Sequence, residues 1–253
     1  MGNHFKIIVP FYNVEQWIGM TIKSVQLQDY KNFECILIDD ISTDKSVPIA
    51  EKILKGDDRF TIIKNKEKKY VLKNISDAIS LSAPSKDDVI VILDGDDWFA
   101  RKDVLSILNE VYDKDDCWLT YGSYIEHPSH VRGKFATKVP KQVVDNNLFR
   151  DSPWMTSHLR TWKYGLWKKV DQQRSFTEPD VLDADNHFAN CWDLAYMFPL
   201  LELAGPRIHF ISDIMYVYNR QNPLNVDKLD HNLQLAMEQK IRSMEKYNPL
   251  RKL

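Results

Sequence analysis

The sequence predicts an α/β fold in which helices flank a mostly parallel β-sheet. The first observation is a set of four short apolar runs with the length of buried strands: Phe5–Val9, Phe33–Ile38, Phe60–Ile63 and Val89–Leu93. The second is that segments of helical length separate these runs, an alternation typical of parallel sheets. The third is composition, because 253 residues, 43% of them hydrophobic, suffice to bury a substantial core.

The connecting segments carry the apolar stripes expected of helices. The clearest stripe lies between Val14 and Gln28, and further helices are expected over Lys45–Lys55, Tyr70–Leu81 and Lys102–Tyr112, followed by a strand over Trp118–Tyr124. Crossovers between parallel strands are right-handed. We therefore expect the carboxyl ends of the first, second and fourth strands to meet at one edge, where open α/β sheets bind ligands.

The second half of the chain has a less regular pattern. Residues Glu126–Asn147 show no helical or strand period and are predicted to form a long surface loop. An aromatic and basic segment, an apolar helix, one or two strands and a last helix then follow, over His158–Val170, Asn190–Leu203, Arg207–Tyr218 and Lys228–Tyr247. We divide the chain into residues 1–124, 125–227 and 228–253 within one compact domain. The last helix is expected to pack on this domain, and a homodimer contact is the alternative.

Charge, hydropathy and cysteine usage exclude several classes of protein. The formal net charge is −2 and the basic residues are interspersed with acidic ones, so no basic surface for nucleic acid is expected. No run approaches the length of about 18 apolar residues that a membrane span requires. Cys35, Cys117 and Cys191 are too far apart for a paired-cysteine metal motif. Buried thiols in a reducing cytoplasm are therefore expected.

An acidic cluster ends the fourth apolar run, where Asp94, Gly95, Asp96 and Asp97 follow one another. Carboxylates this close repel one another and lose hydration near a core, and a bound cation offsets both penalties. Asp94 and Asp96 point to the same side while the chain stays extended. Oxygen ligands suit Mg²⁺ or Mn²⁺ better than zinc. The alternative is an acidic turn that caps the next helix.

Three further clusters lie where strands end or a helix begins: Pro10-Phe-Tyr12-Asn13, Ile38-Asp39-Asp40-Ile-Ser42-Thr-Asp44 and Trp192-Asp193. Each alone also fits an ordinary helix cap. The first two share their predicted sheet edge with the acidic cluster, so together they predict one acidic site there.

These motifs, taken in order, resemble family 2 glycosyltransferases of the GT-A fold. The resemblance rests on Ile8-Val-Pro10-Phe-Tyr12-Asn13, Ser24-Val-Gln-Leu-Gln28, the Asp39-Asp40 segment, Leu93-Asp94-Gly-Asp96-Asp97 and Trp192-Asp193. It is dense over about the first hundred residues and sparse beyond them. It implies a Rossmann-like sheet with a C-terminal extension on the acceptor side. The segments around His158 and over Tyr216–Asn225 resemble a subgroup of giant-virus and bacterial glycan-building enzymes.

The resemblance implies roles in binding a nucleotide-sugar, most simply a UDP-sugar. Pro10, Tyr12 and Asn13 would line the nucleotide pocket, and Asp40 would accept a hydrogen bond from the base with Asp39 in support. Asp94-Gly-Asp96 is similar to the DxD element of the family, so that Asp94 and Asp96 belong to the donor site. Asp96 and Asp97 would hold the ribose and the Mn²⁺ or Mg²⁺ that neutralises the leaving diphosphate.

The resemblance also implies an inverting transfer to a hydroxyl on a glycan, a lipid-linked saccharide or a protein side chain. Asp193 would be the general base. His158 and Arg160 would balance diphosphate charge, and Trp192 and Trp162 would contact the acceptor, although burial in the core is an equal alternative for both tryptophans. Apart from the resemblance, His209 or His231 is a candidate to complete the metal shell, but a plain surface or core role is commoner for such a histidine.

Two departures from the family pattern leave other functions open. Trp192 stands where the family usually has an acid, and Ile41 stands where it has glycine. A catalytically inactive sugar-nucleotide-binding module is one alternative. A nucleotidyltransferase is the other, although the chain lacks a glycine-rich phosphate loop. Cytoplasmic location, in the host if the protein is viral, completes the expectation.

Overall fold

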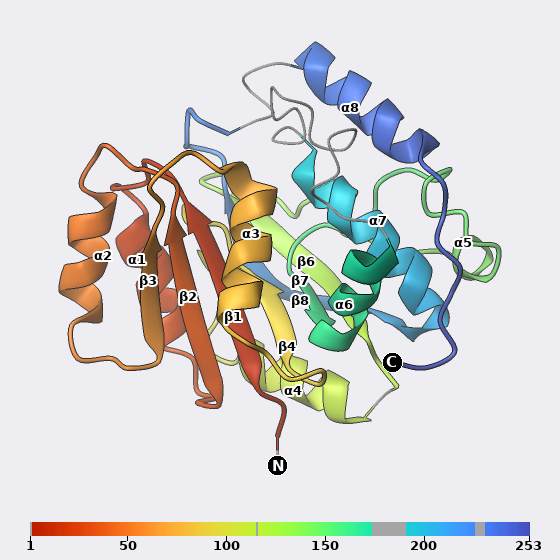
Figure 1. Cartoon of the computed structure of the whole chain (residues 1–253), viewed down its shortest axis with the longest axis horizontal. Helices are drawn as coiled ribbons and strands as arrows, with labels where there is room; N and C mark the ends of the chain where they lie inside the picture. Colours follow the sequence, from red (N-terminus) through yellow and green to blue (C-terminus); the bar gives the residue numbers. More distant parts are fainter. Residues whose placement is uncertain (1, 115, 174–190, 226–230) are drawn as a thin grey trace.

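A computed structural model describes residues 2–114, 116–173, 191–225 and 231–253. Its centre is an eight-stranded sheet with strand order β3-β2-β1-β4-β7-β6-β8-β5 (Figure 1). Strands from residues 1–124 and from residues 125–227 share this sheet. The predicted α/β class with a mostly parallel sheet in its first half is confirmed.

The first four strands are parallel, as predicted: β1 (Phe5–Phe11), β2 (Phe33–Asp39), β3 (Phe60–Lys64) and β4 (Val89–Ile92). Ile8 on β1 lies opposite Ile36 on β2 and Ile92 on β4. Every residue of β1 is buried, because helices cover both faces of the sheet and leave neither open to water. The carboxyl ends of β1, β2 and β4 consequently meet at one edge, the upper edge in Figure 1.

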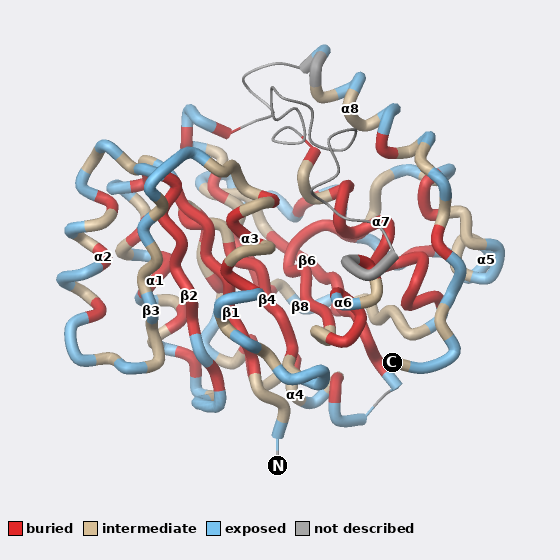
Figure 2. The backbone as a smooth tube through the Cα atoms, in the orientation of Figure 1, coloured by how far each residue is buried: buried red, intermediate tan, exposed pale blue. Residues whose placement is uncertain are grey.

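Alternating side chains of these strands build two apolar clusters, one on each face. Ile8 and Ile36 belong to the cluster that includes α3 (Tyr70–Leu81), whereas Ile7 and Leu37 belong to the cluster of α1 (Ile18–Gln26), α2 (Ser46–Leu54) and α4 (Val104–Lys114). The strands therefore run through the most deeply buried part of the molecule (Figure 2).

The rest of the chain adds the remaining elements: β5 (Trp98–Phe99), β6 (Leu119–His127), α5 (Lys141–Asp145), β7 (Arg160–Lys163), α6 (Tyr164–Gln173), α7 (Trp192–Ala204), the 3₁₀ turn η2 (Gly205–Arg207), β8 (Ile208–Asn219) and α8 (His231–Ser243). Here β7 is antiparallel to β4 and β6, while β8 is parallel to β6. The aromatic and basic segment His158–Val170 is thus a strand followed by a helix.

The predicted long loop is partly ordered into regular elements. Its first residues complete β6, a bridge joins Ile125 to Arg132, and α5 lies near its end. The start of the predicted helix at Asn190 and the expected start of the last helix at Lys228 fall outside the described residues.

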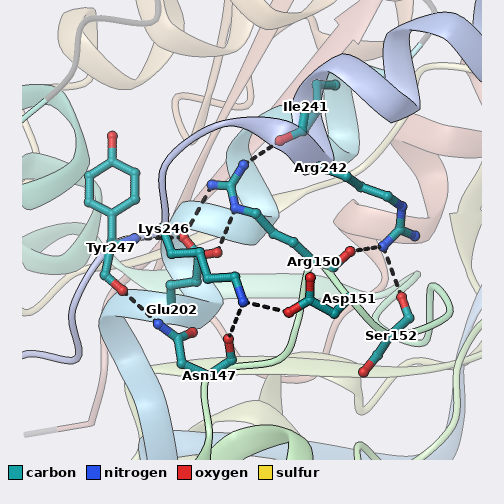
Figure 3. A network of polar contacts seen from close by, with 9 residues as sticks. All are labelled: Asn147, Arg150, Asp151, Ser152, Glu202, Ile241, Arg242, Lys246 and Tyr247. Atoms are coloured by element: carbon teal, nitrogen blue, oxygen red, sulfur yellow. Dashed lines mark hydrogen bonds and ion pairs between the residues drawn. The ribbon is translucent and has the colours of Figure 1, made fainter.

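Helix α7 is apolar on all sides and buried from Leu194 to Ala204, so it lies inside the molecule. It carries one buried acid, Glu202, which accepts from the Arg150 Nε at 2.6 Å and from the backbone N–H of Tyr247 at 2.9 Å (Figure 3). Arg242 also donates to the carbonyl of Arg150 at 2.6 Å. This network joins α7 to the segment after α5 and to the C-terminal residues that follow α8.

Two further expectations concern the membrane and the thiols. Within the described ranges, no helix combines the length and the hydropathy that a bilayer crossing needs. Cys35, Cys117 and Cys191 are free and buried, as expected. Burial raises the pKa of Cys191 to about 12, so this thiol stays protonated at neutral pH.

Candidate active site

The acidic cluster leaves β4 at the edge where the parallel strands end. A Cβ at Gly95 would lie 2.4 Å from the Cβ of Phe11 and 3.1 Å from the carbonyl oxygen of Pro10, so only glycine fits there. The Gly95 N–H donates to that same oxygen at 3.1 Å, and its carbonyl accepts from the Thr21 hydroxyl at 2.9 Å. The turn is therefore locked against the end of β1.

Asp97 is fixed to β8. Its side chain is buried at 1% exposure and accepts from the Tyr216 hydroxyl at 2.6 Å and from the backbone N–H of Asn219 at 2.7 Å. Burial raises its pKa well above the ordinary value, and the charges of Asp96 and Asp94 add to that effect. Both carboxylate oxygens of Asp97 thus serve to hold the turn onto β8.

Asp94 and Asp96 are less enclosed than Asp97. The Tyr216 hydroxyl lies 3.3 Å from Asp94 Oδ2, but its one proton goes to the nearer Asp97. Burial raises the pKa of Asp94 to about 6, the charge of Arg160 opposes this rise, and the charge of Asp96 reinforces it. Asp96 accepts from the Asn222 side chain at 2.7 Å.

The described residues offer one donor set for a metal ion. Asp94, Asp97 and His158 each present a ligand atom, and these atoms lie within 4.8 Å of one another. Burial keeps the pKa of His158 well below its usual value, and the charge of Arg160 acts in the same direction. The imidazole is therefore neutral, which is the form that binds metals. Two carboxylates and an imidazole fit a divalent cation such as Mn²⁺.

This donor set differs from the pair expected from the sequence. It contains Asp97 but not Asp96, which is half-buried in the same turn. His209 is not in the set, and the side chain of His231 lies outside the described part of the chain. The assignment of Asp96 and Asp97 to the metal stays a prediction.

Asp193 lies in the first turn of α7, where a negative charge is favoured by the helix dipole. Its Oδ2 accepts from Arg160 Nη1 at 3.0 Å, and its Oδ1 accepts from the Leu194 N–H at 3.0 Å. Arg160 comes from β7, and its Nη2 lies 3.0 Å from His158 Nδ1 and 3.9 Å from Asp94 Oδ2. The structure thus brings the late acid beside the acidic cluster of β4.

A second cluster of polar residues lies at the end of β2. Asp40 accepts from the backbone N–H groups of Lys69 at 2.8 Å and Tyr70 at 3.0 Å, and the ammonium group of Lys68 lies 3.3 Å away. Burial raises the pKa of Asp40, but these hydrogen bonds, those of Asn74 and Asn65 and the charge of Lys68 outweigh burial and hold it below the ordinary value. Asp40 is thus held as a carboxylate.

Residues on either side of Asp40 shape the same loop. Asp39 accepts from the Ser42 N–H at 3.0 Å, and the Asn13 side chain accepts from the Thr43 N–H at 2.8 Å. Ile41 has a φ of +66°, a conformation that favours glycine and is strained for a β-branched residue. The conformation of Ile41 is thus one that the glycine of the resembled family would adopt without strain.

Tyr12 is the exposed aromatic residue of this region. It follows β1, is 39% exposed, and has the Lys68 ammonium group 3.1 Å from its ring centroid. Pro10 is buried within β1 opposite Ile38. The tyrosine ring therefore offers a flat surface beside the Asp40 carboxylate.

The two tryptophans expected at the acceptor side occupy different places. Trp162 is fully buried and stacks on Trp167, with 5.7 Å between the two ring centroids. An acceptor therefore has no access to it. Trp192 is partly exposed, and its ring lies 5.8 Å from Tyr196 and 4.9 Å from the Arg160 guanidinium.

Sequence reasoning missed the role of β8 and the residues after it. Tyr216, Asn219 and Asn222 all hold carboxylates of the acidic cluster. The available signal was the motif from Tyr216 to Asn225, which stood out in the sequence but had no assigned chemistry. Its partners lie more than a hundred residues earlier, so spacing gave no way to pair them.

Comparison with known proteins identifies the family. The sequence profile described as Glycosyl transferase family 2 matches residues 6–174. The chain is 24% identical to glycosyltransferase GlyG of Streptococcus pneumoniae over 225 residues, which are 88% of this chain and 72% of GlyG. It is 30% identical over 148 residues to WfgD of Escherichia coli, a UDP-Glc:alpha-D-GlcNAc-diphosphoundecaprenol beta-1,3-glucosyltransferase, covering 57% of this chain and 54% of WfgD.

Two solved structures share the fold. Staphylococcus aureus TarS 1-349 in complex with UDP-GlcNAc superposes with a TM-score of 0.68 at 18% identity, over 94% of this chain and 65% of that one. The mannosyltransferase PcManGT of Pyrobaculum calidifontis, in complex with GDP-Man and Mn²⁺, gives a TM-score of 0.59 at 18% identity. The match covers 98% of this chain and 66% of PcManGT. The chain thus spans less than two thirds of either solved chain. Because the profile match covers well over half of its residues, this chain belongs to glycosyltransferase family 2 and has the GT-A fold.

Proposed function

We propose that this protein transfers a sugar from a nucleotide-sugar, most simply a UDP-sugar, to a hydroxyl acceptor with inversion at the anomeric carbon. The observation that carries the proposal is the convergence of Asp40, the acidic cluster after β4 and Asp193 on one edge of the sheet. The printed names of WfgD, TarS and PcManGT, with their UDP-Glc, UDP-GlcNAc and GDP-Man, support a nucleotide-sugar donor.

The base would bind at the end of β2. Tyr12 has a partly exposed ring for stacking, and Asp40, which is held as a carboxylate, would accept a hydrogen bond from an N–H of the base. Asn13 and Asp39 shape the same loop, and Pro10 lies beside it near the end of β1. An acceptor group of this kind fits uracil or guanine, which carry a ring N–H, better than adenine or cytosine.

The diphosphate would bind at the turn after β4 together with a divalent cation. Asp94, Asp96 and Asp97 with His158 are the candidates to hold it, and such a cation neutralises the charge that develops on the leaving diphosphate. Mn²⁺ and Mg²⁺ are the two candidates, and the Mn²⁺ in the PcManGT complex supports the first.

Asp193 would act as the general base. As the acceptor oxygen attacks the anomeric carbon, the bond from that carbon to the diphosphate oxygen breaks, and the acceptor proton passes to Asp193. The nucleoside diphosphate leaves, and this single displacement inverts the anomeric centre. Trp192 at the start of α7 is the candidate surface for the acceptor, which we expect to be a glycan, a lipid-linked saccharide or a protein side chain.

Three expectations from the sequence stay predictions: the cytoplasmic location, the homodimer contact through α8 and the giant-virus or bacterial subgroup.

The test is a panel of nucleotide-sugars scored by Mn²⁺-dependent thermal stabilisation and then by product analysis. We expect free nucleoside diphosphate and a glycosylated acceptor, with Asp193→Asn lowering transfer by about 100-fold or more while donor binding persists. Release of pyrophosphate would instead identify a nucleotidyltransferase. Donor binding without turnover, unchanged by Asp193→Asn, would identify an inactive binding module.

A further inference from the structure

We infer that Arg160 is a positioning residue that holds Asp193 in place beside the donor site. This inference rests on the proposed function of Asp193. It differs from the role that the resemblance implies for Arg160, which is to balance the charge of the donor diphosphate.

The backbone places Arg160 at the edge of the sheet where the parallel strands end. It is the first residue of β7 and lies opposite Ile92, the last residue of β4, in an antiparallel pair. Asp94 follows Ile92 after only one more residue. The next two residues, Thr161 and Trp162, also pair with β6, so the strand that carries Arg160 is held on both sides.

The side chain of Arg160 is enclosed by its partners. It is 1% exposed, with Asp193, His158 and Asp94 around its two terminal nitrogens. The aromatic rings of Trp192 and Tyr196 lie 4.9 and 5.9 Å from its central carbon. A diphosphate therefore has no open surface of Arg160 to bind, whereas Asp193 and Asp94 keep part of their side chains accessible.

The side chain of Arg160 contacts both the proposed general base and the acidic cluster of the proposed donor site. One arm of the guanidinium fork binds the general base on α7, and the other lies near the acid cluster and the imidazole of His158. The fork is planar and rigid, so it fixes the direction of Asp193 Oδ2 relative to Asp94. Lysine carries the same charge but has one ammonium group in place of this fork.

The chain contains a matched control for a purely structural role. Arg150 is equally buried, at 1% exposure, and its guanidinium pairs with Glu202, the other acid on α7 (Figure 3). Arg150 and Glu202 lie in the network that anchors the C-terminal segment, and neither contacts the acidic cluster in any described interaction.

The experiment compares Arg160→Lys with Arg150→Lys in the full chain. We expect Arg160→Lys to lower kcat by about 10- to 100-fold, with donor KM and nucleoside diphosphate affinity within about threefold, because a misplaced base slows the chemical step. Arg150→Lys should lower the unfolding midpoint and leave kcat within about threefold. An equal loss of donor affinity in Arg160→Lys, or an unchanged kcat, would overturn the inference.

Two further measurements show whether Arg160 acts through Asp193. Adding Arg160→Lys to Asp193→Asn should lower kcat by less than about a further threefold. If the two residues had independent roles, their separate losses in kcat would multiply. A crystal structure of Arg160→Gln should show the Asp193 carboxylate in a new orientation, and an unmoved carboxylate refutes the inference whether or not the wild type turns over. Absence of transfer by the wild type, in contrast, refutes the proposed function.

Discussion

Asp96 and Asp97 are adjacent in the chain but differ in what their carboxylates contact. Asp97 uses both oxygens to hold Tyr216 and the backbone of Asn219, whereas Asp96 makes its described hydrogen bond to the side chain of Asn222. The first carboxylate therefore holds the turn onto β8, whereas the second contacts the segment that follows β8.

This difference predicts that substitutions at the two neighbouring positions affect different properties, stability in one case and metal dependence in the other. Asp97→Ala removes the acceptor of the Asn219 N–H and the nearer acceptor of the Tyr216 hydroxyl, and should lower the free energy of unfolding by about 2–4 kcal/mol. Asp96→Ala removes the acceptor of the Asn222 side chain and should cost less, about 1 kcal/mol, while weakening the stimulation of transfer by Mn²⁺ if Asp96 binds the metal as the resemblance implies. Urea unfolding and metal titration of both variants provide the measurements, and equal destabilisation by the two would contradict the assignment.

Asp40 gives a prediction about pH. Its folded-state pKa lies below the ordinary value of 3.8, so its contribution to stability is complete above pH about 4 and is lost as the pH falls through the folded-state pKa. Asp40→Asn places an amide opposite the N–H groups of Lys69 and Tyr70, and should cost about 1–3 kcal/mol at pH 7. Urea titrations at pH 7 and pH 3 should show this difference shrinking at the lower pH. A constant difference would mean that the Asp40 charge is not its source.

Helix α7 carries two acids with different surroundings, one near each end. Asp193 in the first turn is partly exposed beside the proposed reaction site, while Glu202 near the last turn is fully buried in the network of Figure 3. The same helix thus presents a reactive group at one end and is anchored at the other.

The ion pair between Arg150 and Glu202, which anchors α7, can be tested apart from the reaction. Arg150→Leu leaves Glu202 as an uncompensated buried charge and should lower the free energy of unfolding by about 3–5 kcal/mol. The control is Arg101→Leu, which removes the exposed pair with Asp103 and should cost about 1 kcal/mol or less. Chemical denaturation of both variants measures the contrast, and a similar cost for the two would show that burial of the pair has no special effect.

Elements differ in how well the sequence predicts them. The runs that became β1 to β4 are continuous and apolar because both faces of those strands are buried, which is a strong local signal. β5 has two residues, and β7 has four that lead directly into α6. Such short strands are defined by pairing with distant strands, and local periodicity does not report that pairing.

The same reason separates the predictable part of the site from the rest. Asp40 and the acidic cluster follow strands, so their convergence could be expected from the topology of a parallel sheet. Tyr216 reaches the cluster from a strand that pairs with β5 and β6, and Arg160 reaches it from an antiparallel partner of β4. No rule of chain order places those two side chains.

At the scale of the whole molecule, the C-terminal residues close the apolar face over α7. Tyr247 is buried, its N–H donates to Glu202, and the Leu250 N–H donates to the Leu203 carbonyl at 2.9 Å. Removing residues 244–253 should therefore lower the thermal midpoint and expose apolar surface that binds a hydrophobic dye. Lys252→Ala, at an exposed position, is the control. An unchanged midpoint in the truncated protein would show that these contacts add little.

The hydrogen bond between Asp97 and Asn219 joins residues 122 positions apart. While the ribosome makes the chain, Asp97 thus has neither of its two donors until β8 has emerged, although the strand that carries it is completed much earlier. A nascent chain that stops before Asn219 therefore has the acidic cluster without its support. The acidic cluster can therefore adopt its described geometry only after residue 219 has been made.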